Sequence, residues 1–573
     1  MKNIKIISSA IFISAILFSH RTFFAQQAPE IEWQYRYGGT SMDYGYSIIQ
    51  AQGNIADNYV FAGSAILSDG DLAGCNPIGF KGWIVSMDGA GAILWQECLG
   101  DSKATFAETY TNRIIRTSDG GYAVCGETSS LEGFFFGNHG GEYDAFVAKL
   151  DSNGNTLWVK CFGGSGWDVG VSIIETKDEG RDLVIVGVTN SKDGDVSGWH
   201  IDTSENKWSD IWVVRMSSEG KIRWQKCLGG TGQDGTNGGS PIIQTKDGGF
   251  VISGTTTSND GDVTGNHLDS NKHPSQDFWI IKLDPKGTIQ WQKCFGGSGA
   301  DEVSETIETS EGGYAAVGRT SSMDGDVIGL HKPFDQFNES DIWVIKFDSF
   351  GSLQWQKCFG GGLEESGSSI VQIPNGSFII AGLTSSNNGD VSGNHGESDA
   401  WIVRLNDKGA IQWQKCYGGS GQEVASCLIK TSNGGYAFVG STNSIDGDLL
   451  FSNYHGDYDI WVVKLEPDTI TASVPPSYSS DFVHNNVKIY PNPSQVDVHF
   501  SVNSIFSLSG AGFYDMLGRQ YFPKYSLENN LLSCDIHDFP SGIYLARLGW
   551  TSGMTWRDGV YPGSFTLPFL VQH

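Results

Sequence analysis

Acidic side chains recur at regular intervals and are the first candidates for chemistry in this sequence. Clustered carboxylates and backbone carbonyls suit a hard cation, so one interpretation is a calcium site in each copy. The alternative is a turn, in which Asp accepts hydrogen bonds from nearby backbone N–H groups and Gly takes unusual φ/ψ. The spacing does not match the calcium loop of helix-loop-helix sensors, so we favour the turn and keep calcium as the alternative. The segments are Asp69–Asp71, Glu132–Gly133, Asp193–Asp195, Asp260–Asp262, Asp324–Asp326, Asn388–Asp390 and Asp446–Asp448.

A histidine follows most of these segments, and an Asp-x-Trp or Asp-x-Phe element follows the histidine. Zinc needs several ligands close together, whereas each histidine is alone in its copy. We therefore expect structural histidines and assign no metal ligand. The histidines are His139, His200, His267, His331, His395 and His455, and the matching acids are Asp144, Asp210, Asp277, Asp341, Asp399 and Asp459.

Cysteines form a third series at one repeat position. Equivalent points on neighbouring units lie too far apart for a disulfide, which needs Cα atoms within about 7 Å. We expect buried free thiols at Cys98, Cys161, Cys227, Cys294, Cys358 and Cys416. A bridge among Cys75, Cys125, Cys427 and Cys534 stays open.

The elements that position these residues are copies of one repeat. A segment of the form Trp-Gln-Lys-Cys, an apolar or aromatic residue and Gly-Gly recurs 58 to 67 residues apart. The copy from Trp291 holds four strand-like pieces, namely 290–295, 303–309, 313–318 and 341–347. Four short strands per repeat are typical of β-propeller blades. The copies begin at Trp33, Trp95, Trp158, Trp224, Trp291, Trp355 and Trp413.

The two ends of the repeat region predict a closed ring. The last copy ends at 459–465 with no following Trp-Gln-Lys strand, and the chain begins with such a strand at 31–37. The N-terminal strand can therefore complete the last blade of a seven-bladed propeller. Thirteen of the 18 Trp fall on two strand positions. We interpret them as packing between blades, the alternative being a sugar-stacking ladder.

Composition limits the function classes. The chain has 573 residues and a formal charge of −28, which argues against binding nucleic acid. Residues 1–25 have the pattern of a secretory signal peptide: two early lysines and then an apolar run too short to span a membrane. No later segment is long and apolar enough for a transmembrane helix. We expect the propeller to occupy residues 26–467 and a linker to occupy 468–486.

Three short elements mark the C-terminal part: Tyr490-Pro491-Asn492-Pro493, then Leu517-Gly518-Arg519, then Pro540-Ser541-Gly542-Ile543-Tyr544. In order and spacing they resemble the C-terminal sorting domain of the type IX secretion system of Bacteroidota. The resemblance covers 487–573, with a longer stretch than usual at 549–565. It implies a small β-sandwich, recognition by the secretion machinery, and export across the outer membrane to the cell surface or medium.

The expected fold is therefore all-β: a seven-bladed β-propeller of four-stranded blades closed by the N-terminal strand, plus a small C-terminal β-sandwich sorting domain. The favoured function is a surface-displayed binding or adhesion module for an extracellular glycan or protein. Loop length varies most between each His and the Asp-x-Trp element, so the face carrying these loops is the candidate binding surface.

The alternative function is a propeller enzyme, either a lyase or hydrolase acting on polysaccharide or a quinoprotein. The segment from Asp348 to Trp355 is similar to pyrroloquinoline-quinone-type propeller repeats. An enzyme site would need departures from the repeat, such as Trp199, His200 and Trp208, or the run 134–136. None of these pairs an acid with a base, so we assign no catalytic, cofactor-binding or metal residue.

Overall fold

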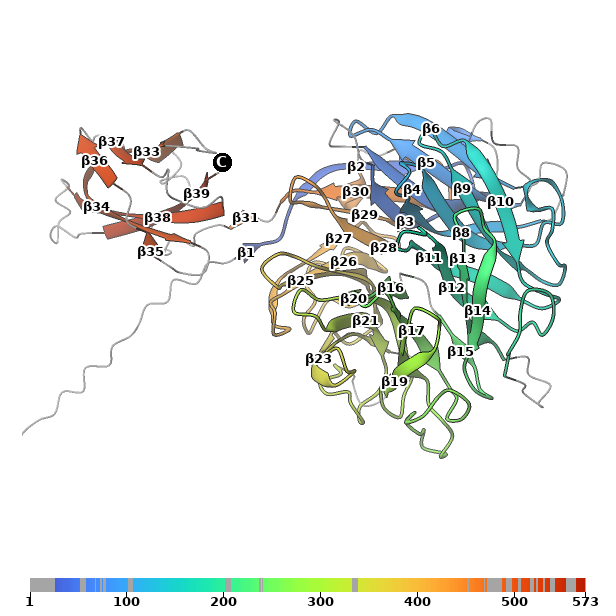
Figure 1. Ribbon diagram of the computed structural model, residues 1–573. Coiled ribbons are helices and arrows are strands. Elements are labelled where there is room, and N and C mark those ends of the chain that lie inside the picture. Colours follow the sequence, from blue (N-terminus) through green and yellow to red (C-terminus); the bar gives the residue numbers. More distant parts are fainter. Residues whose placement is uncertain are drawn as a thin grey trace, which may run out of the picture. The chain divides into compact units, whose positions relative to one another are not determined.

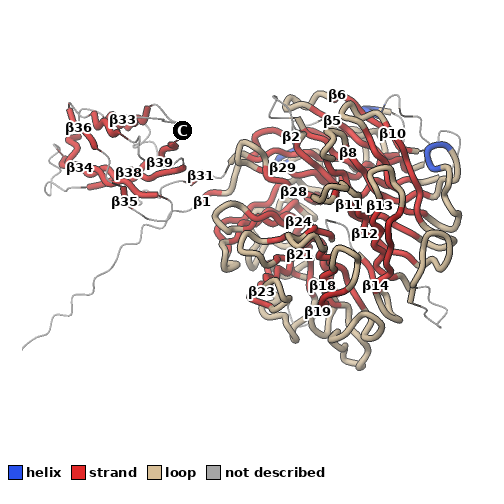
Figure 2. The backbone as a smooth tube through the Cα atoms, in the orientation of Figure 1, coloured by secondary structure: helices blue, strands red, loops and turns tan. Residues whose placement is uncertain are grey.

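The computed structural model is nearly all β (Figure 1, Figure 2). It describes residues 26–467 except 52–57, 67–68, 73–74, 76–78, 101–106, 201–207, 237–238, 240, 332–338 and 451–452, and the strands that lie between 469 and 571. The expected signal peptide and most of the expected linker lie outside the described residues. Residues 28–468 form one compact unit, and the rest of the chain forms a second.

Seven sheets make up the first unit. We call them blades, number them in chain order, and give the strands of each blade from the innermost to the outermost. Blade 1 contains β3 (Asp43–Gln50), β4 (Tyr59–Ile66), β5 (Phe80–Met87) and β6 (Ile93–Leu99). Blade 2 contains β7 (Thr109–Arg116), β8 (Tyr122–Thr128), β9 (Asp144–Leu150) and β10 (Thr156–Phe162). Blade 3 contains β11 (Asp168–Glu175), β12 (Leu183–Thr189), β13 (Asp210–Met216) and β14 (Ile222–Leu228).

Blade 4 differs in that its inner strand is broken into two short pieces. It contains β15 (Asp234–Gly235), β16 (Ile242–Gln244), β17 (Phe250–Thr256), β18 (Asp277–Leu283) and β19 (Ile289–Phe295). Blade 5 contains β20 (Asp301–Glu308), β21 (Tyr314–Thr320), β22 (Asp341–Phe347) and β23 (Leu353–Phe359). Blade 6 contains β24 (Glu365–Gln372), β25 (Phe378–Thr384), β26 (Asp399–Leu405) and β27 (Ile411–Tyr417).

Blade 7 closes the ring as the sequence predicts. It contains β28 (Glu423–Lys430), β29 (Tyr436–Thr442), β30 (Asp459–Leu465) and, outermost, the N-terminal strand β2 (Ile31–Tyr37). Strand β2 runs antiparallel to β30, with Tyr35 opposite Val462. Each Trp-Gln-Lys-Cys strand is thus the outer strand of a blade, so the sequence repeat is offset from the blade by one strand.

The third strand of each blade is buried along almost its whole length, because neighbouring blades cover both of its faces. Its Trp lies at the interface between blades: the Trp343 ring meets Phe278 of blade 4 at 4.6 Å between centroids. Trp343 Nε1 also donates to Gln356 Oε1 of the outer strand at 2.9 Å. Trp83, Trp212, Trp279, Trp401 and Trp461 make the same bond to the Gln of their own outer strand.

The tryptophans of the outer strands also join blades, which confirms the packing interpretation for this second series. Trp95 of blade 1 lies 5.6 Å from Tyr122 of blade 2, and Trp355 of blade 5 lies 6.0 Å from Phe378 of blade 6, both between ring centroids. Except for the buried Trp413, the rings of this series remain half-buried, whereas those on the third strands are fully buried.

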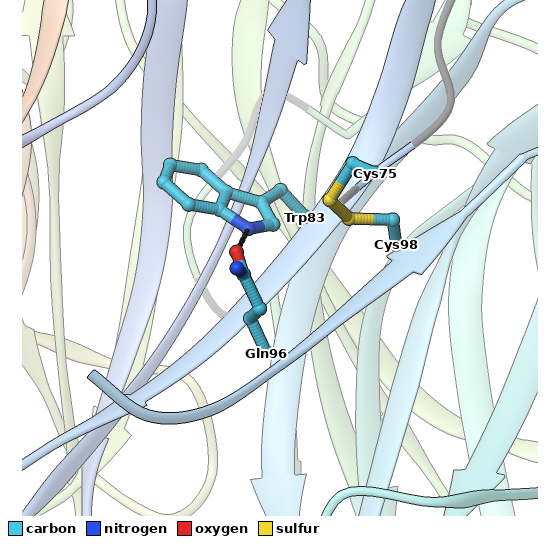
Figure 3. The surroundings of a disulfide bond; sticks show 4 residues. All are labelled: Cys75, Trp83, Gln96 and Cys98. Carbon is cyan, nitrogen blue, oxygen red and sulfur yellow. Dashed lines mark hydrogen bonds between the residues drawn. A yellow bond between two sulfur atoms is a disulfide. The ribbon is translucent and has the colours of Figure 1, made fainter. Parts of the chain in front are cut away.

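The expectation of buried free thiols is wrong at Cys98, which is not free, and at Cys161 and Cys294, which are only half-buried. Cys98 of β6 forms a disulfide with Cys75 in the loop before β5 (Figure 3). The bridge lies within one blade, so the distance between blades does not forbid it. At the same repeat position, Cys161, Cys294 and Cys416 are free, and each thiol donates to a carbonyl of the corresponding loop at 3.6 Å. Cys534 lies where no side chains are described.

The C-terminal part of the second unit contains two four-stranded sheets. One runs β32 (Val487–Tyr490), β33 (Asp497–Val502), β37 (Leu531–Asp535) and β36 (Lys524–Glu528). The other runs β35 (Gln520–Tyr521), β34 (Phe506–Asp515), β38 (Gly542–Ser552) and β39 (Gly563–Val571). Strand β1 (Gln26–Gln27) pairs with β31 (Thr469–Ile470). The described residues include no helix with the length and apolar character needed to span a membrane.

Candidate binding site

The Asp-Gly-Asp loops hold the connections between blades. Asp193 accepts hydrogen bonds from Ser165 N at 2.7 Å and from Ser165 Oγ at 2.9 Å. Ser165 lies between β10 of blade 2 and β11 of blade 3, so the loop of one blade caps the linker that enters it. Asp69, Asp260, Asp324, Asn388 and Asp446 accept the equivalent backbone bond. These contacts are those of a turn motif that joins blades. Among the described residues, no three His, Cys, Asp or Glu side chains are grouped so that they could hold a metal ion.

At five junctions, a histidine connects one blade to the next. His331 Nδ1 lies 2.7 Å from Asp341 of its own blade, and its Nε2 lies 3.5 Å from Asp390 of blade 6. His455 of blade 7 lies 3.6 Å from Asp71 of blade 1, so a contact of the same kind closes the ring. We call this arrangement, in which one histidine contacts an acid on each of two neighbouring blades, the histidine latch. His139, His200 and His267 make equivalent pairs of contacts.

A second set of acids is buried at the start of the inner strands. Asp301 accepts hydrogen bonds from Ser322 Oγ at 2.7 Å, from Gly297 N at 2.8 Å and from Thr320 Oγ1. Burial raises the pKa of Asp301 to about 7, against the lowering effect of these hydrogen bonds. The equivalent acids are Asp43, Asp168, Asp234, Glu365 and Glu423.

Most of the departures singled out in the sequence have structural roles, whereas Phe134 and Phe136 are exposed. His200 makes the same latch as its equivalents, and Trp199 Nε1 donates to Trp208 O at 3.2 Å. Phe135 is fully buried and lies 5.1 Å from Phe146, measured between ring centroids. Phe146 stands where the other blades carry Trp, so Phe135 fills the space that the missing indole ring leaves. In the same blade, Val159 replaces the Gln that would have bonded that indole.

The central channel carries the asymmetry. The inner strands of six blades contain a β-bulge at the same position, where one residue has no partner on the second strand. The unpaired residues are Tyr46, Asn112, Val171, Ser304, Ser368 and Ser426. In blade 4, Gly239 occupies the corresponding place and approaches the backbone of Ser304 so closely that a Cβ would lie 2.3 Å from its carbonyl oxygen.

One residue further along these strands, an ion pair crosses the channel. Arg113 of blade 2 lies 3.7 Å from Glu305 of blade 5 and 3.5 Å from Cys427 Sγ of blade 7. Glu305 also accepts from Ser369 Oγ and Ile370 N of blade 6, both at 2.7 Å. Both charged side chains are largely buried. Side chains of four blades therefore meet at this level of the channel.

The bulge residues line a cavity of about 470 Å³, together with Tyr110 and Glu127. This volume is within the usual range of small-molecule sites, about 300–1,000 Å³. Tyr110 of β7 pairs with Glu127 of β8. Both residues are one position from the end of their strand, at the edge of the blade that carries the Asp-Gly-Asp loops. The cavity is therefore at the end of the channel on the face that the sequence indicated. Parts of the variable loops of that face, 201–207 and 332–338, lie outside the described residues.

One wall of the cavity is bulky and the other is small. Tyr46, Asn112, Tyr110 and Glu127 come from blades 1 and 2. The remaining lining residues, from blades 3 to 7, are Val171, Gly239, Ser304, Ser368 and Ser426. The repeat thus supplies seven similar positions, and substitutions on two neighbouring blades make one side of the cavity aromatic and acidic.

Further tyrosines continue the bulky wall. Tyr44 lies 6.5 Å from Tyr46 and 5.7 Å from Tyr458, and Tyr110 lies 6.4 Å from Tyr143, all between ring centroids. Glu108 accepts from the hydroxyls of both Tyr110 and Tyr143.

Glu127 is the acid that lines the cavity. Burial, and then the charge of Glu108, raise its pKa to about 7. Its Oε2 atom is buried and has no hydrogen-bond partner. Glu127 therefore brings an acidic group with one unsatisfied oxygen to the cavity lining.

The sequence reading missed all of these cavity residues. Most of them lie on the inner strand, which has the least regular sequence of the four, whereas Glu127 lies on β8, the second strand of blade 2. The available signal was a comparison of equivalent positions: Ser304, Ser368 and Ser426 in blades 5 to 7 against Tyr46 and Asn112 in blades 1 and 2.

A family model described as "Secretion system C-terminal sorting domain" matches residues 488–557. The chain is therefore a β-propeller repeat protein with a type IX secretion sorting domain, the sorting signal of Bacteroidota. The domain directs the protein to the cell surface or the extracellular medium.

Other comparisons add no activity. "Regulatory protein FlaEY" of Caulobacter vibrioides is 31% identical over 155 residues, which is 25% of this chain and 16% of that protein. The WD40 domain of Neurospora crassa Pan2 is 9% identical and covers 76% of this chain and 100% of that one, with a TM-score of 0.38. A member of the duf4221 family from Bacteroides vulgatus is 8% identical and covers 78% and 99%, with a TM-score of 0.32.

Proposed function

We propose that this protein is a surface-displayed binding or adhesion module that holds an extracellular glycan or protein at the channel mouth. The proposal treats residues 1–25 as a removed signal peptide, 26–467 as the binding propeller, 468–486 as a linker and 487–573 as the sorting domain. The observation that carries it is the cavity of about 470 Å³, where equivalent positions of the blades differ in size and polarity. Aromatic side chains beside a few polar and charged groups are typical of small-ligand sites.

An enzyme that cleaves polysaccharide is the second candidate and has weaker support. Glycoside hydrolysis generally uses two carboxyl groups that flank the bond to be cleaved. Among the described residues that line the cavity, Glu127 is the one that carries a carboxyl group. The nearby Glu108 already accepts two tyrosine hydroxyls. This arrangement favours binding over turnover.

The test is an array of extracellular glycans and matrix proteins probed with the secreted protein. Ser426→Trp places an indole in the cavity and should abolish saturable binding while the melting temperature stays unchanged. The matched control is Ser152→Trp on an exposed turn of blade 2, which should bind as the unmodified protein does. Binding that survives Ser426→Trp would overturn the proposed site, and release of shortened glycan would favour the enzyme.

A further inference from the structure

The charged residue that lines the cavity is acidic. Glu127 lines it, and Glu108 lies directly behind Tyr110. Among the described lining residues there is no Lys or Arg. Arg113, one residue beyond the bulge on β7, is held by Glu305 and Cys427. An anionic ligand would therefore meet uncompensated repulsion.

The aromatic rings complement this charge. Tyr46 and Tyr110 both line the cavity, on neighbouring blades, together with Glu127. A cation within about 6 Å of a ring centroid is attracted by the face of the ring. These three side chains are partly buried, so both attractions are stronger than they would be on an open surface.

We infer that the cavity takes a ligand bearing an ammonium group, with the nitrogen at the carboxyl group of Glu127 and its carbon skeleton against Tyr46 and Tyr110. This inference rests on the proposed function and names the ligand class. An ammonium group supplies an opposite charge and hydrogen-bond donors to this carboxyl group, which has one unsatisfied oxygen. The hydroxyl groups of Ser304, Ser368 and Ser426 on the opposite wall can bond further polar groups of the ligand. Two sources present this chemistry: an amino sugar and the side chain of a lysine.

The test compares ligands that differ in the charge of one group. Glucosamine and N-acetylglucosamine share the pyranose ring, but only the first carries an ammonium group at neutral pH. Titration calorimetry or ligand-observed NMR on the secreted protein should give at least tenfold tighter binding of glucosamine. N-α-acetyl-lysine amide, compared with its N-ε-acetyl derivative, is the arm for a protein lysine. A tenfold preference in either arm supports the inference and identifies the source.

A charge-matched pair of variants then places the nitrogen. Glu127→Gln should remove the preference for the ammonium form, and its fold is expected to survive because Oε2 makes no hydrogen bond. Glu364→Gln changes the net charge equally but lies on the rim of blade 6, half exposed and 3.4 Å from Arg319. It should keep the preference. A preference that persists in Glu127→Gln would overturn the assignment.

The outcomes also separate this inference from the proposed function. Equal binding of the charged and neutral forms, blocked by Ser426→Trp, would overturn the ammonium assignment and leave the channel mouth as a binding site. Failure of both amines to bind up to millimolar concentration, with a different array ligand blocked by Ser426→Trp, would do the same. Array binding that is unchanged by Ser426→Trp would overturn both the ammonium assignment and the channel mouth as the binding site.

Discussion

The junction between blades 5 and 6 and the junction between blades 1 and 2 are built differently. At the first, His331 joins Asp341 to Asp390, and the buried Glu365 accepts from Gly361 N of the linker. At the second, Lys81 stands where the latch acid would be and donates to Ala107 O.

Other parts of the second junction also differ. Thr109 replaces the buried acid and bonds Thr128 Oγ1 at 2.9 Å. The Cys75–Cys98 disulfide holds the loop of blade 1. The bulky wall of the cavity lies on these same two blades. The repeated junctions thus hold the ring together, and the sequence departs from the repeat on the two blades that form the bulky wall of the candidate site.

The largest effect should come from pH, because it acts on every junction with buried acids. Burial raises the pKa of Asp43, Asp234 and Asp301 to about 7 from 3.8, and raises those of Asp144 and Asp399 to about 6. Folding therefore favours the protonated acids, and the stability they contribute is complete below pH of about 4 and lost as pH rises to about 7.

The latch histidines shift in the same direction. Hydrogen bonding to its partner acid raises the pKa of His200, His267 and His455, so their contribution is also lost at rising pH. Asp119 and Asp247 behave in the opposite way. Against the effect of burial, hydrogen bonds lower the pKa of each to about 2, so their contribution to folding stability is lost only below pH of about 4. Calorimetry at constant ionic strength should give the highest melting temperature near pH 4–5 and a steady fall to pH 8. A maximum at pH 7–8 would contradict the assigned burial of these acids.

Removal of an indole at a repeated junction should have the next largest effect. Trp343→Ala deletes a fully buried ring between blades 4 and 5 and should destabilise the propeller by about 3–5 kcal/mol in chemical denaturation. Phe350→Ala, on a turn where the ring is 77% exposed, is the control and should change stability by less than about 0.5 kcal/mol. An unchanged transition in Trp343→Ala would show that the ring does not hold the blades together.

Loss of the disulfide should weaken the divergent junction. Cys75→Ser opens a bridge that spans 23 residues, for which the loop-entropy model gives about 3 kcal/mol. Cys294→Ser, at the same repeat position as Cys98 but unbridged, should cost about 1 kcal/mol or less. The two variants are compared by melting temperature with and without reductant. Reductant should affect only the parent and Cys294→Ser, and equal effects on all three would contradict the bridge.

The smallest expected effect is the coupling energy between two substitutions that give blade 5 the residues found in blade 2. Trp343→Phe leaves Gln356 Oε1 without its donor, and adding Gln356→Val recreates the pair Phe146 and Val159 of blade 2. The second change should therefore cost about 1 kcal/mol less in the Trp343→Phe background than in the parent. A double-mutant cycle measures this energy, and strict additivity would show that the bond between Trp and Gln contributes nothing.

Much of the fold could be predicted from the sequence because its signals are local and repeated. The periodic Trp-Gln-Lys-Cys element, ended by Gly-Gly, gives the number of blades, and a strand at each end of the repeat region gives the closure. A continuous apolar run such as Asp341–Phe347 shows burial on both faces without knowledge of the neighbours.

The candidate site depended on the tertiary structure, because it joins residues that are distant in the chain and unremarkable alone. Tyr46 and Ser426 line one cavity only because β2 pairs with β30 and closes the ring. Arg113 and Glu305, each one residue beyond the bulge of its inner strand, meet only because the closed ring places blades 2 and 5 around one channel. Sequence periodicity determines which faces of the strands are buried, but only ring closure determines which side chains face each other across the channel.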